Sequence, residues 1–390
     1  MRIGIDVSTW GNKRGIGRFT RELVTALLKV ETDYEYLFFV DSQTFKSHSF
    51  PKQMAIVPVT TGTSPESGLT LGSSRPLKDV WAFARAVGTS RLDVVFLPFW
   101  SLYFPILDRR TKVVSTIHDL IEYQHRSSIP TARWLLMRAK HQLCLSRSSA
   151  IVTPSRYSKQ QVVDRFRVAE EKVHVIPEAA SRLFQPRTGE TLYPDTLRKR
   201  EILPGRRFLL FVGSLDAHKG LAILLQAYAE LVADAAFTDV KLVIVGAHEN
   251  AMLSSRADLE QGVRRGDLSG SVIVTGFVSD EDLLALYQFA TLVVMPSSAE
   301  GFGLPALEAM ACATPVLASS AGSLPEVVGS SGDFFAPNDA GALFAKLRDV
   351  VNQTEQLKRM AAYGLQRAQS FSWSNSARSL AALLERVGNG

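Results

Sequence analysis

Short apolar segments alternate with segments of helical periodicity along the whole chain. Runs rich in Val, Ile and Phe predict first-half strands at residues 2–6, 36–40, 94–97, 113–117, 150–153 and 173–176. Further strands are predicted at residues 208–212, 241–245, 272–275, 292–295 and 315–318. The helical pattern predicts helices at residues 17–30, 131–146 and 155–166. Strands alternating with helices are typical of parallel sheets covered on both faces, so the pattern predicts an α/β fold.

A break in this alternation divides the chain. Residues 182–205 are rich in Pro and Gly and carry few helix or strand signals, so we expect them to form a linker. The division predicts two Rossmann-like, doubly wound parallel-sheet domains, at residues 1–185 and 186–373. We expect a ligand to bind in a central cleft that the carboxyl ends of both sheets face. Residues 42–74, rich in Ser, Thr, Pro and Gly, are expected to form a mobile loop region.

Composition excludes several classes of protein. The 390 residues are 46% hydrophobic and 21% charged, which is too apolar for a disordered chain. Cys144 and Cys312 lie far apart without a Cys-x-x-Cys pair, which argues against a disulfide scaffold or a zinc site. The longest apolar runs are as short as strands, and the first six residues read as a strand rather than a signal peptide. We therefore expect a soluble, cytoplasmic protein.

The net charge of +6 conceals an asymmetry between the two halves. Residues 1–185 contain 26 Lys and Arg against 16 Asp and Glu, whereas the remaining residues contain 18 against 22. A basic half joined to a slightly acidic half suggests that the first half meets something anionic. The basic charge of the whole chain by itself would suggest a nucleic-acid-binding protein, but its concentration in one half is a more specific signal and points to an anionic partner of that half. A solvated basic surface without a partner is the alternative.

Two segments that follow predicted strands of the first half could contact a ligand. Gly15-Ile16-Gly17 opens a helix, but Thr20 stands where a dinucleotide fingerprint has its third glycine. Glycines at such a junction let backbone N–H groups approach a phosphate or sugar, although a structural turn uses them as well. His118-Asp119 follows the strand at 113–117, which places His118 at the mouth of the cleft. There it either donates to a hydroxyl or phosphate or has a purely structural role.

A lysine stands at a strand-to-helix junction of the second half. Lys219 lies between Gly213 and Gly220, directly before a predicted helix. A lysine at a helix N-terminus opposes the helix dipole unless an anion lies there. We therefore interpret Lys219 as a phosphate ligand rather than as a surface charge.

Two glutamates flank a glycine-rich loop. Glu300 lies in the loop after the strand at 292–295, and Glu308 falls early in the helix that Pro305 begins. Their separation argues against a single acid–base pair and favours contacts with two ends of an extended polar ligand. The amides around 301–304 would meet its anionic middle. A contact of Glu308 with the helix dipole would explain that glutamate alone, but not the loop.

An acidic triplet has a structural explanation. Asp280-Glu281-Asp282 matches the D-x-D pattern that holds metal-bound nucleotide sugars in other enzymes. It follows Ser279 and precedes an apolar-periodic segment. We interpret it as the acidic first turn of a helix capped by Ser279, and not as a metal site.

Taken together, these residues resemble the retaining glycosyltransferases of family 4, which have the two-domain GT-B fold. The resemblance covers nearly the whole chain, and its most specific part is the E-x7-E motif from Glu300 to Glu308. The other segments that are similar to the family lie at residues 153–158, 175–177, 276–278, 315–316 and 322–326.

The resemblance implies a role for each candidate residue. Glu308 would bind the ribose, Glu300 the donor sugar and Lys219 the diphosphate. The remaining residues implied at the donor site are Ser214, Val278, Gly301, Phe302, Gly303 and Leu304. His118 would contact the transferred sugar, and the acceptor side would be lined by Gly15, Ile16, Gly17 and Asp119. After a crossing marked by Trp373, the last helix, at 374–390, would return to the first domain.

The chain departs from the family pattern at two places. Ser214 and His218 stand where many members have Arg, so neutralisation of the diphosphate depends more on Lys219. Glu178-Ala179 stands where many members have Asn-Gly, which leaves the role of that turn open.

The expected reaction is transfer of a hexose from a nucleoside diphosphate sugar to a saccharide hydroxyl, with retention of configuration. The resemblance places it in polysaccharide or glycoconjugate biosynthesis, with no catalytic metal, no other cofactor and no nucleic acid. GDP-mannose and UDP-glucose are the leading donors. The alternatives are a catalytically silent sugar-nucleotide-binding partner, and an epimerase or phosphorylase-like enzyme of the same fold.

A basic helix bears on the acceptor. Residues 131–145 predict a helix in which Trp134 and several Leu are interleaved with Arg and Lys. Such a helix can lie on an anionic bilayer, which would place the protein peripherally on the inner face of the cytoplasmic membrane with a lipid-linked saccharide acceptor. Alternatively, it packs Trp134, Leu135 and Leu143 into its own domain, and the acceptor is a soluble saccharide.

Overall fold

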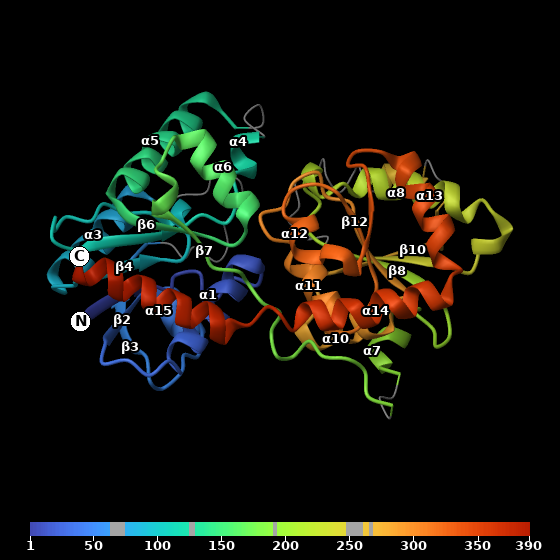
Figure 1. Cartoon of the computed structure of the whole chain (residues 1–390), viewed down its shortest axis with the longest axis horizontal. Helices are drawn as coiled ribbons and strands as arrows, with labels where there is room; N and C mark the ends of the chain where they lie inside the picture. Colours follow the sequence, from blue (N-terminus) through green and yellow to red (C-terminus); the bar gives the residue numbers. More distant parts are fainter. Residues whose placement is uncertain (63–74, 125–128, 190–192, 247–259, 265–267) are drawn as a thin grey trace. The chain divides into compact units, whose positions relative to one another are not determined.

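The computed structural model of the chain describes residues 1–62, 75–124, 129–189, 193–246, 260–264 and 268–390. These residues form two compact units (Figure 1). The first unit comprises Met1–Glu178 together with Ser372–Gly390, and the second comprises Ala179–Phe371.

The first unit is built on a parallel sheet. In the part of the chain described, its strand order is β3-β2-β1-β4-β5-β6-β7. The strands are β1 (Arg2–Asp6), β2 (Glu35–Asp41), β3 (Ala55–Val59), β4 (Val94–Leu97), β5 (Lys112–Thr116), β6 (Ser148–Thr153) and β7 (Val173–Val175). Every neighbouring pair is parallel, so the carboxyl ends of all these strands lie along one edge.

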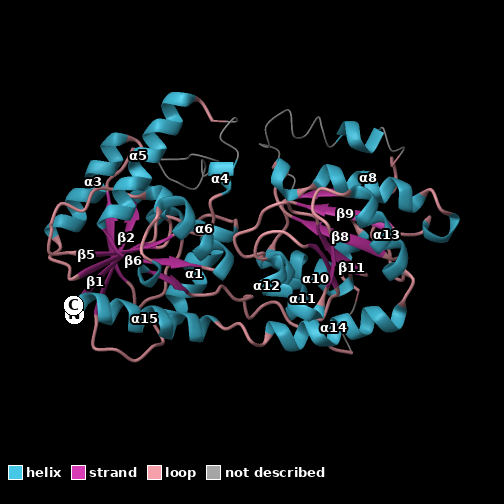
Figure 2. Ribbon diagram, turned by 45° about the horizontal axis from the view of Figure 1, so that its top comes forward, coloured by secondary structure: helices cyan, strands magenta, loops and turns pink. Residues whose placement is uncertain are grey.

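Helices cover both faces of this sheet. They are α1 (Gly15–Leu27), α2 (Ser42–Ser47), α3 (Leu77–Thr89), η2 (Trp100–Leu102), α4 (Ile121–Gln124), α5 (Thr131–Arg147), α6 (Arg156–Phe166), η4 (Glu170–Lys172) and α15 (Trp373–Asn389). Helices α3, α5 and α6 share a core with Val95 and Leu97 of β4. Helix α15 packs on α1 and contacts β4 and β5, on the side of the sheet away from α3 and α5 (Figure 2).

The second unit repeats this architecture. Its described strands have the order β10-β9-β8-β11-β12-β13 and are parallel. They are β8 (Phe208–Val212), β9 (Lys241–Val245), β10 (Val272–Gly276), β11 (Leu292–Met295), β12 (Val316–Ser319) and β13 (Asp333–Phe335).

Two layers of helices enclose the second sheet. They comprise α7 (Asp195–Arg198), η5 (Ala217–Lys219), α8 (Leu221–Val232), η6 (Ala235–Phe237), α10 (Asp280–Phe289), α11 (Leu304–Ala311), α12 (Leu324–Val328), η7 (Gly329–Ser331), α13 (Ala340–Val351) and α14 (Thr354–Ala368). One core unites α10, α11 and α12 with one face of the sheet, and another unites α8 and α13 with the other face.

The predicted alternation is confirmed, since every predicted strand and helix has a counterpart at its expected place. The expectation of a loop at 42–74 is wrong where the chain is described, because α2 and β3 lie there. Strand β3 contains Pro58, which an edge strand tolerates because its outer side has no ladder to complete. Residues 63–74 lie outside the described residues.

The expected linker at 182–205 is also corrected. Phe184, Leu197 and Ile202 are buried in the core of the second unit, so this segment belongs to that unit. The first unit therefore ends at Glu178 rather than at residue 185, and the returning segment begins at Ser372. Residues 190–192 of the expected linker lie outside the described residues.

Candidate functional site

Two loops lie close together at the carboxyl edge of the second sheet. The first, residues 213–220, connects β8 to α8, and the second, residues 296–303, connects β11 to α11. The backbone N–H of Ser298 donates to the carbonyl of His218 at 2.8 Å. Gly220 has φ +70, and a Cβ there would lie 2.0 Å from the carbonyl oxygen of Pro296. Glycine is therefore required at this position for the loops to approach each other.

These loops bring two predicted residues into direct contact. The ammonium of Lys219 donates to Oε1 of Glu300 at 2.7 Å, and the hydroxyl of Ser297 donates to the same oxygen at 2.8 Å. The side chains of Lys219 and Glu300 are 19% and 7% exposed. The anion beside Lys219 at the start of α8 is thus supplied by the protein itself, in addition to any phosphate that binds there.

The backbone of Glu300 is held from a third loop, which follows β12. The N–H and the hydroxyl of Ser323 both donate to the carbonyl of Glu300, at 3.2 and 3.1 Å. Ser323 is fully buried. The carboxylate of Glu300 is therefore presented by a rigid turn rather than by a free loop.

The glycine-rich turn offers mainly backbone groups. Gly303 precedes the first turn of α11, which contains Pro305 as expected. The side chains of Phe302 and Leu304 are buried in the core, and Phe302 packs edge-on against Phe371. At Gly301, Phe302, Gly303 and Leu304, main-chain amides at the start of a helix are thus the groups suited to an anion.

Glu308 lies deep in the same helix. It is 2% exposed, and Oε2 accepts a hydrogen bond from the hydroxyl of Tyr287 at 3.0 Å. It is not in the first turn of α11, so the helix-dipole explanation for this residue is wrong. Burial, with the nearby charge of Glu308, raises the pKa of the Cys312 thiol to about 12. Tyr287 carries no motif and was not identified from the sequence.

Two further donor candidates have local roles. The hydroxyl of Ser214 donates to Oδ2 of Asp216 at 2.6 Å, within the β8–α8 loop. The side chain of Val278 is buried in the core, which leaves its backbone as the polar part.

The acidic triplet begins α10, and Ser279 accepts from the N–H of Asp282 as expected of a cap.

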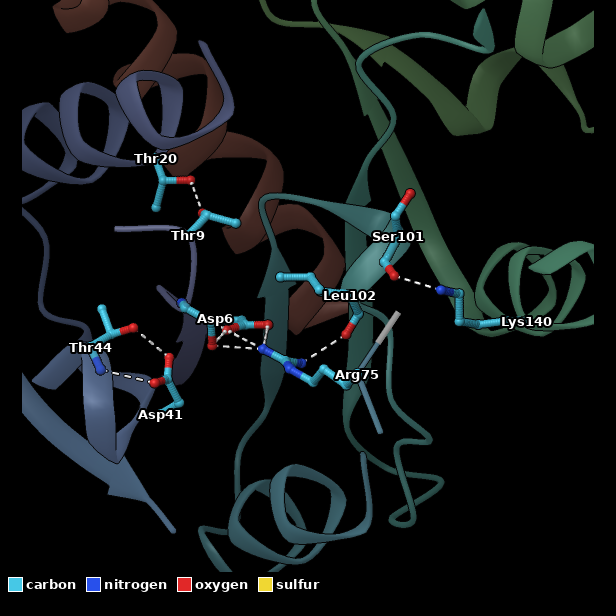
Figure 3. A network of polar contacts seen from close by, with 10 residues as sticks. Asp6, Thr9, Thr20, Asp41, Thr44, Arg75, Ser101, Leu102 and Lys140 are labelled. Carbon is cyan, nitrogen blue, oxygen red and sulfur yellow. Dashed lines mark hydrogen bonds and ion pairs between the residues drawn. The ribbon is translucent and has the colours of Figure 1, made fainter. Parts of the chain in front are cut away.

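In the first unit, the candidate glycines form the start of α1. Gly15, Ile16 and Gly17 occupy its first turn. A Cβ on Gly17 would lie 1.9 Å from the carbonyl oxygen of Asn12, so the preceding loop packs directly on the helix backbone. The hydroxyls of Thr9 and Thr20 lie 2.7 Å apart and fasten this loop to α1 (Figure 3).

His118 lies at the carboxyl end of β5 with both ring nitrogens engaged. Nε2 is 3.0 Å from the carbonyl oxygen of Pro98, and Nδ1 is 3.2 Å from Oε1 of Glu178. The ring of Phe19 packs edge-on against the imidazole, with centroids 4.5 Å apart. Burial lowers the pKa of His118, but the hydrogen bond and charge of Glu178, with smaller contributions from Pro98 and Asp119, raise it overall.

Asp119 has a structural contact at the same strand end. Its Oδ1 accepts from the N–H of Ile121 at 3.0 Å, at the start of α4. The hydroxyl of Ser158 donates to the carbonyl of His118 at 2.9 Å, which ties α6 to this turn.

A buried ion pair that sequence reasoning missed supports the loop after β1. The guanidinium of Arg75 contacts both carboxylate oxygens of Asp6, at 2.8 and 3.1 Å, and donates to the hydroxyl of Ser8 at 2.6 Å (Figure 3). It also donates to the carbonyl of Leu102 at 2.7 Å. The two charged residues are 69 positions apart, and no local pattern links them.

Helix α5 divides its apolar residues between core and solvent. Trp134 is buried, as packing into the unit requires. Leu135, Leu136 and Leu143 are 58%, 73% and 45% exposed, so the expectation that Leu135 and Leu143 pack inward is wrong. Exposed Arg133 and Arg138 lie on the same helix.

Within the residues that the structure describes, no cluster of three or more His, Cys, Asp or Glu could hold a metal ion. No helix in the described ranges combines the length and apolarity needed to span a membrane.

Comparison with known proteins identifies the family. The second unit matches the model for glycosyl transferases group 1 over residues 194–367, and the first matches glycosyltransferase family 4 over residues 13–180. The chain is 32% identical to O-antigen chain mannosyltransferase B of Escherichia coli over 277 residues, 70% of each chain. The chain belongs to glycosyltransferase family 4.

Other similar proteins agree with this assignment. The glycosyltransferase is 32% identical over 290 residues to an MMP α-(1→4)-mannosyltransferase of Mycolicibacterium hassiacum, covering 70% of this chain and 65% of that one. The crystal structure of Anabaena HepE in complex with UDP and glucose superposes with a TM-score of 0.75 at 18% identity, over 99% of this chain and 100% of that one. The two parallel-sheet units therefore constitute the GT-B fold.

Proposed function

We propose that this glycosyltransferase moves a hexose, with mannose favoured, from a nucleoside diphosphate sugar to a saccharide hydroxyl. The observation that carries the proposal is the Lys219–Glu300 pair between the starts of α8 and α11. Helix N-termini and a lysine favour an anion, and a carboxylate suits sugar hydroxyls, so one arrangement serves both parts of the donor. The two mannosyltransferases at 32% identity support mannose, and UDP-glucose is the alternative donor.

The donor roles follow from the chemistry of each group. Glu308, buried in α11, would accept hydrogen bonds from the ribose diol, while the amides of residues 301–304 and the hydroxyl of Ser214 would meet the diphosphate. Lys219 would exchange part of its contact with Glu300 for a phosphate oxygen, and Glu300 would turn toward the sugar hydroxyls. Val278 would contribute backbone contacts near the nucleotide.

The first unit would supply the groups for the transferred sugar and the acceptor. His118 would contact the transferred sugar, and the turn of Gly15, Ile16 and Gly17, with Asp119, would line the acceptor side. The loop before these glycines is fastened to α1 by the buried contact of Thr9 with Thr20, so the backbone at the start of α1 is preorganised for binding.

We propose retention by front-face attack. The bond between the anomeric carbon and the phosphate oxygen breaks as the acceptor oxygen bonds on the same face. The acceptor proton passes to the departing phosphate oxygen, so the products are the glycoside and a nucleoside diphosphate. Lys219 and the helix N-termini would stabilise the growing charge on the diphosphate, and in this proposal they replace a divalent metal.

The test of this proposal is a transfer assay with purified full-length protein, GDP-mannose or UDP-glucose, and a mixture of oligosaccharides and lipid-linked saccharides. Proton NMR of the product gives the anomeric configuration, and an EDTA arm tests the metal. The expected result is an α-linked product from an α-linked donor, with activity retained in EDTA. An inverted product or a strict metal requirement would contradict the mechanism, and nucleotide binding without transfer would favour a silent binding partner.

We also propose that the acceptor is presented at an anionic membrane surface, on the inner face of the cytoplasmic membrane. Three exposed leucines lie on α5, the helix that also carries the exposed Arg133 and Arg138, and basic residues contribute about 1 kcal/mol each near an anionic bilayer. Co-sedimentation with phosphatidylglycerol vesicles should be strong at low salt and weak at high salt. Leu136→Glu should abolish it, whereas Tyr363→Glu, at a 58% exposed site on α14, should not. Equal binding of both variants, or none by the wild type, would favour a soluble acceptor.

A further inference from the structure

Glu178, which departs from the family pattern, lies beside His118, and this contact suggests its role. His118 follows β5, and Glu178 follows β7, two strands away at the same edge of the first sheet. The Nδ1–Oε1 distance is 3.2 Å, and the two side chains are 10% and 8% exposed. Because so little water reaches this contact, its hydrogen bond is stronger than it would be in water and influences the protonation of the imidazole.

The contacts of the imidazole define its protonation. A carbonyl oxygen can only accept, so Nε2, 3.0 Å from Pro98, must carry a proton. Nδ1 lies 3.2 Å from Oε1 of Glu178, and this hydrogen bond and the charge of the carboxylate raise the pKa of His118, which favours a proton on Nδ1 as well. With both nitrogens protonated, the ring is an imidazolium, and its charge is balanced by Glu178.

The surroundings of the ring favour the same state. Among the described residues, the charged groups that act on His118 are Glu178, after β7, and Asp119, next to it after β5, both acidic. From α1 it meets the ring of Phe19, and from the segment after β4 the ring of Phe99 and the Pro98 carbonyl. From α6 the hydroxyl of Ser158 donates to its backbone carbonyl. None of these neighbours supplies a positive charge that would oppose protonation.

The position of Glu178 is itself fixed. The hydroxyl of Ser376, on α15, donates to the carbonyl of Pro177 at 2.6 Å. Trp373, at the start of the same helix, packs on Phe19, which in turn packs on His118. The residue that precedes Glu178 is thus anchored to α15, and the carboxylate is held beside the ring.

We propose that Glu178 is a positioning residue that keeps His118 doubly protonated and its ring fixed between Glu178 and Pro98. The functional consequence rests on the proposed transfer reaction. An imidazolium has no acceptor nitrogen, and both of its N–H groups are engaged by Pro98 and Glu178, so His118 acts on the donor sugar through its positive charge. It cannot serve as a general base for the acceptor hydroxyl.

The test is an NMR titration of the ring nitrogens in the full chain labelled with 15N-histidine, without any sugar nucleotide. His118→Gln assigns the signal among the seven histidines. In the wild type, both nitrogens of His118 should remain protonated above the pH at which an ordinary histidine titrates. In Glu178→Gln the titration midpoint of His118 should shift to lower pH. In Glu178→Asp, which keeps a carboxylate, the midpoint should return most of the way to the wild-type value.

His174 on β7 provides an internal control. Burial, with the charges of Arg386 and Lys159, lowers the pKa of His174, so it should titrate at low pH in all variants. A neutral His118 in the wild type near pH 7, or a midpoint that Glu178→Gln leaves unchanged, would overturn the proposal. If Glu178→Gln fails to fold, the titration midpoints of His118 in the wild type and in Glu178→Asp still test the proposal.

The assay separates this inference from the proposed function. The titration needs no transfer activity, so an inactive protein with a protonated His118 would overturn only the reaction. In an active enzyme, kcat/KM of Glu178→Gln should fall as pH rises through the lowered His118 midpoint that the titration measures, whereas kcat/KM of the wild type should not change over the same range. A uniform loss at every pH would indicate a merely structural role for Glu178.

Discussion

Lys219 and Glu300 form an ion pair of 2.7 Å between two loops, 81 positions apart in the chain. The pair joins the start of α8 to the turn before α11, where backbone amides converge. A donor diphosphate that binds there must share Lys219 with Glu300. The pair is therefore both a structural contact and the centre of the proposed donor site.

Lys219→Ala should lower kcat as well as donor affinity. The charge on the diphosphate grows in the transition state, so its cation stabilises that state more than the bound substrate. Steady-state kinetics with the donor separate the two effects. Lys346→Ala, which removes an ion pair of 2.8 Å with Asp333 in the same unit, is the matched control and should have little effect. A rise in KM with unchanged kcat would show that Lys219 does not stabilise the departing diphosphate in the transition state.

Glu308→Ala should weaken nucleotide binding by about 1.5–3 kcal/mol for each charge-assisted hydrogen bond to the ribose. Nucleotide-induced stabilisation in a thermal-shift assay measures this loss. Tyr287→Phe removes only the hydroxyl that donates to Glu308 and should have a smaller effect. Unchanged nucleotide affinity in a folded Glu308→Ala protein would show that this carboxylate has only a structural role.

Local sequence signals and long-range contacts differ in how far they could be predicted. The turn around Glu300 and the cap at Ser279 were recognisable because each depends on neighbouring residues. The partners Arg75 of Asp6, Tyr287 of Glu308 and Glu178 of His118 were not, because the fold alone brings them together. Strand β3 was missed because Pro58 and its Ser- and Thr-rich surroundings obscure a short edge strand.

Asp6→Ala should destabilise the first unit by about 3–5 kcal/mol, because it leaves the guanidinium of Arg75 buried without its counter-ion. The two side chains are 6% and 3% exposed. Urea unfolding followed by circular dichroism measures the change. Glu35→Ala is the control, since it breaks a surface pair with Arg2 and should cost under about 1 kcal/mol. Similar costs for the two variants would contradict the importance of the buried pair.

The stability of the first unit should depend on pH through His118. Its folded pKa lies above the ordinary value of 6.5, so the pair with Glu178 contributes fully below that pH. The contribution is lost as pH rises through the folded pKa. Urea unfolding at several pH values should show this loss in the wild type and a flatter profile in Glu178→Gln. Parallel profiles for the two proteins would mean that another group causes the dependence.

Truncation after Gln369 should destabilise the first unit although the deleted residues lie at the end of the chain. Helix α15 buries Ala377, Leu380 and Leu384 completely and packs on α1. Limited proteolysis followed by mass spectrometry should show new cleavage within residues 1–178. A truncated protein as resistant as the full chain in that range would refute the contribution of α15.

The most direct test of the donor site is isothermal titration of GDP and UDP into the full-length protein and its Lys219→Ala and Lys346→Ala variants. The account predicts one-to-one binding of at least one nucleotide by the wild type, unchanged affinity in Lys346→Ala and clearly weaker binding in Lys219→Ala. Failure of the folded wild type to bind either nucleotide, or equal affinities in all three proteins, would contradict it.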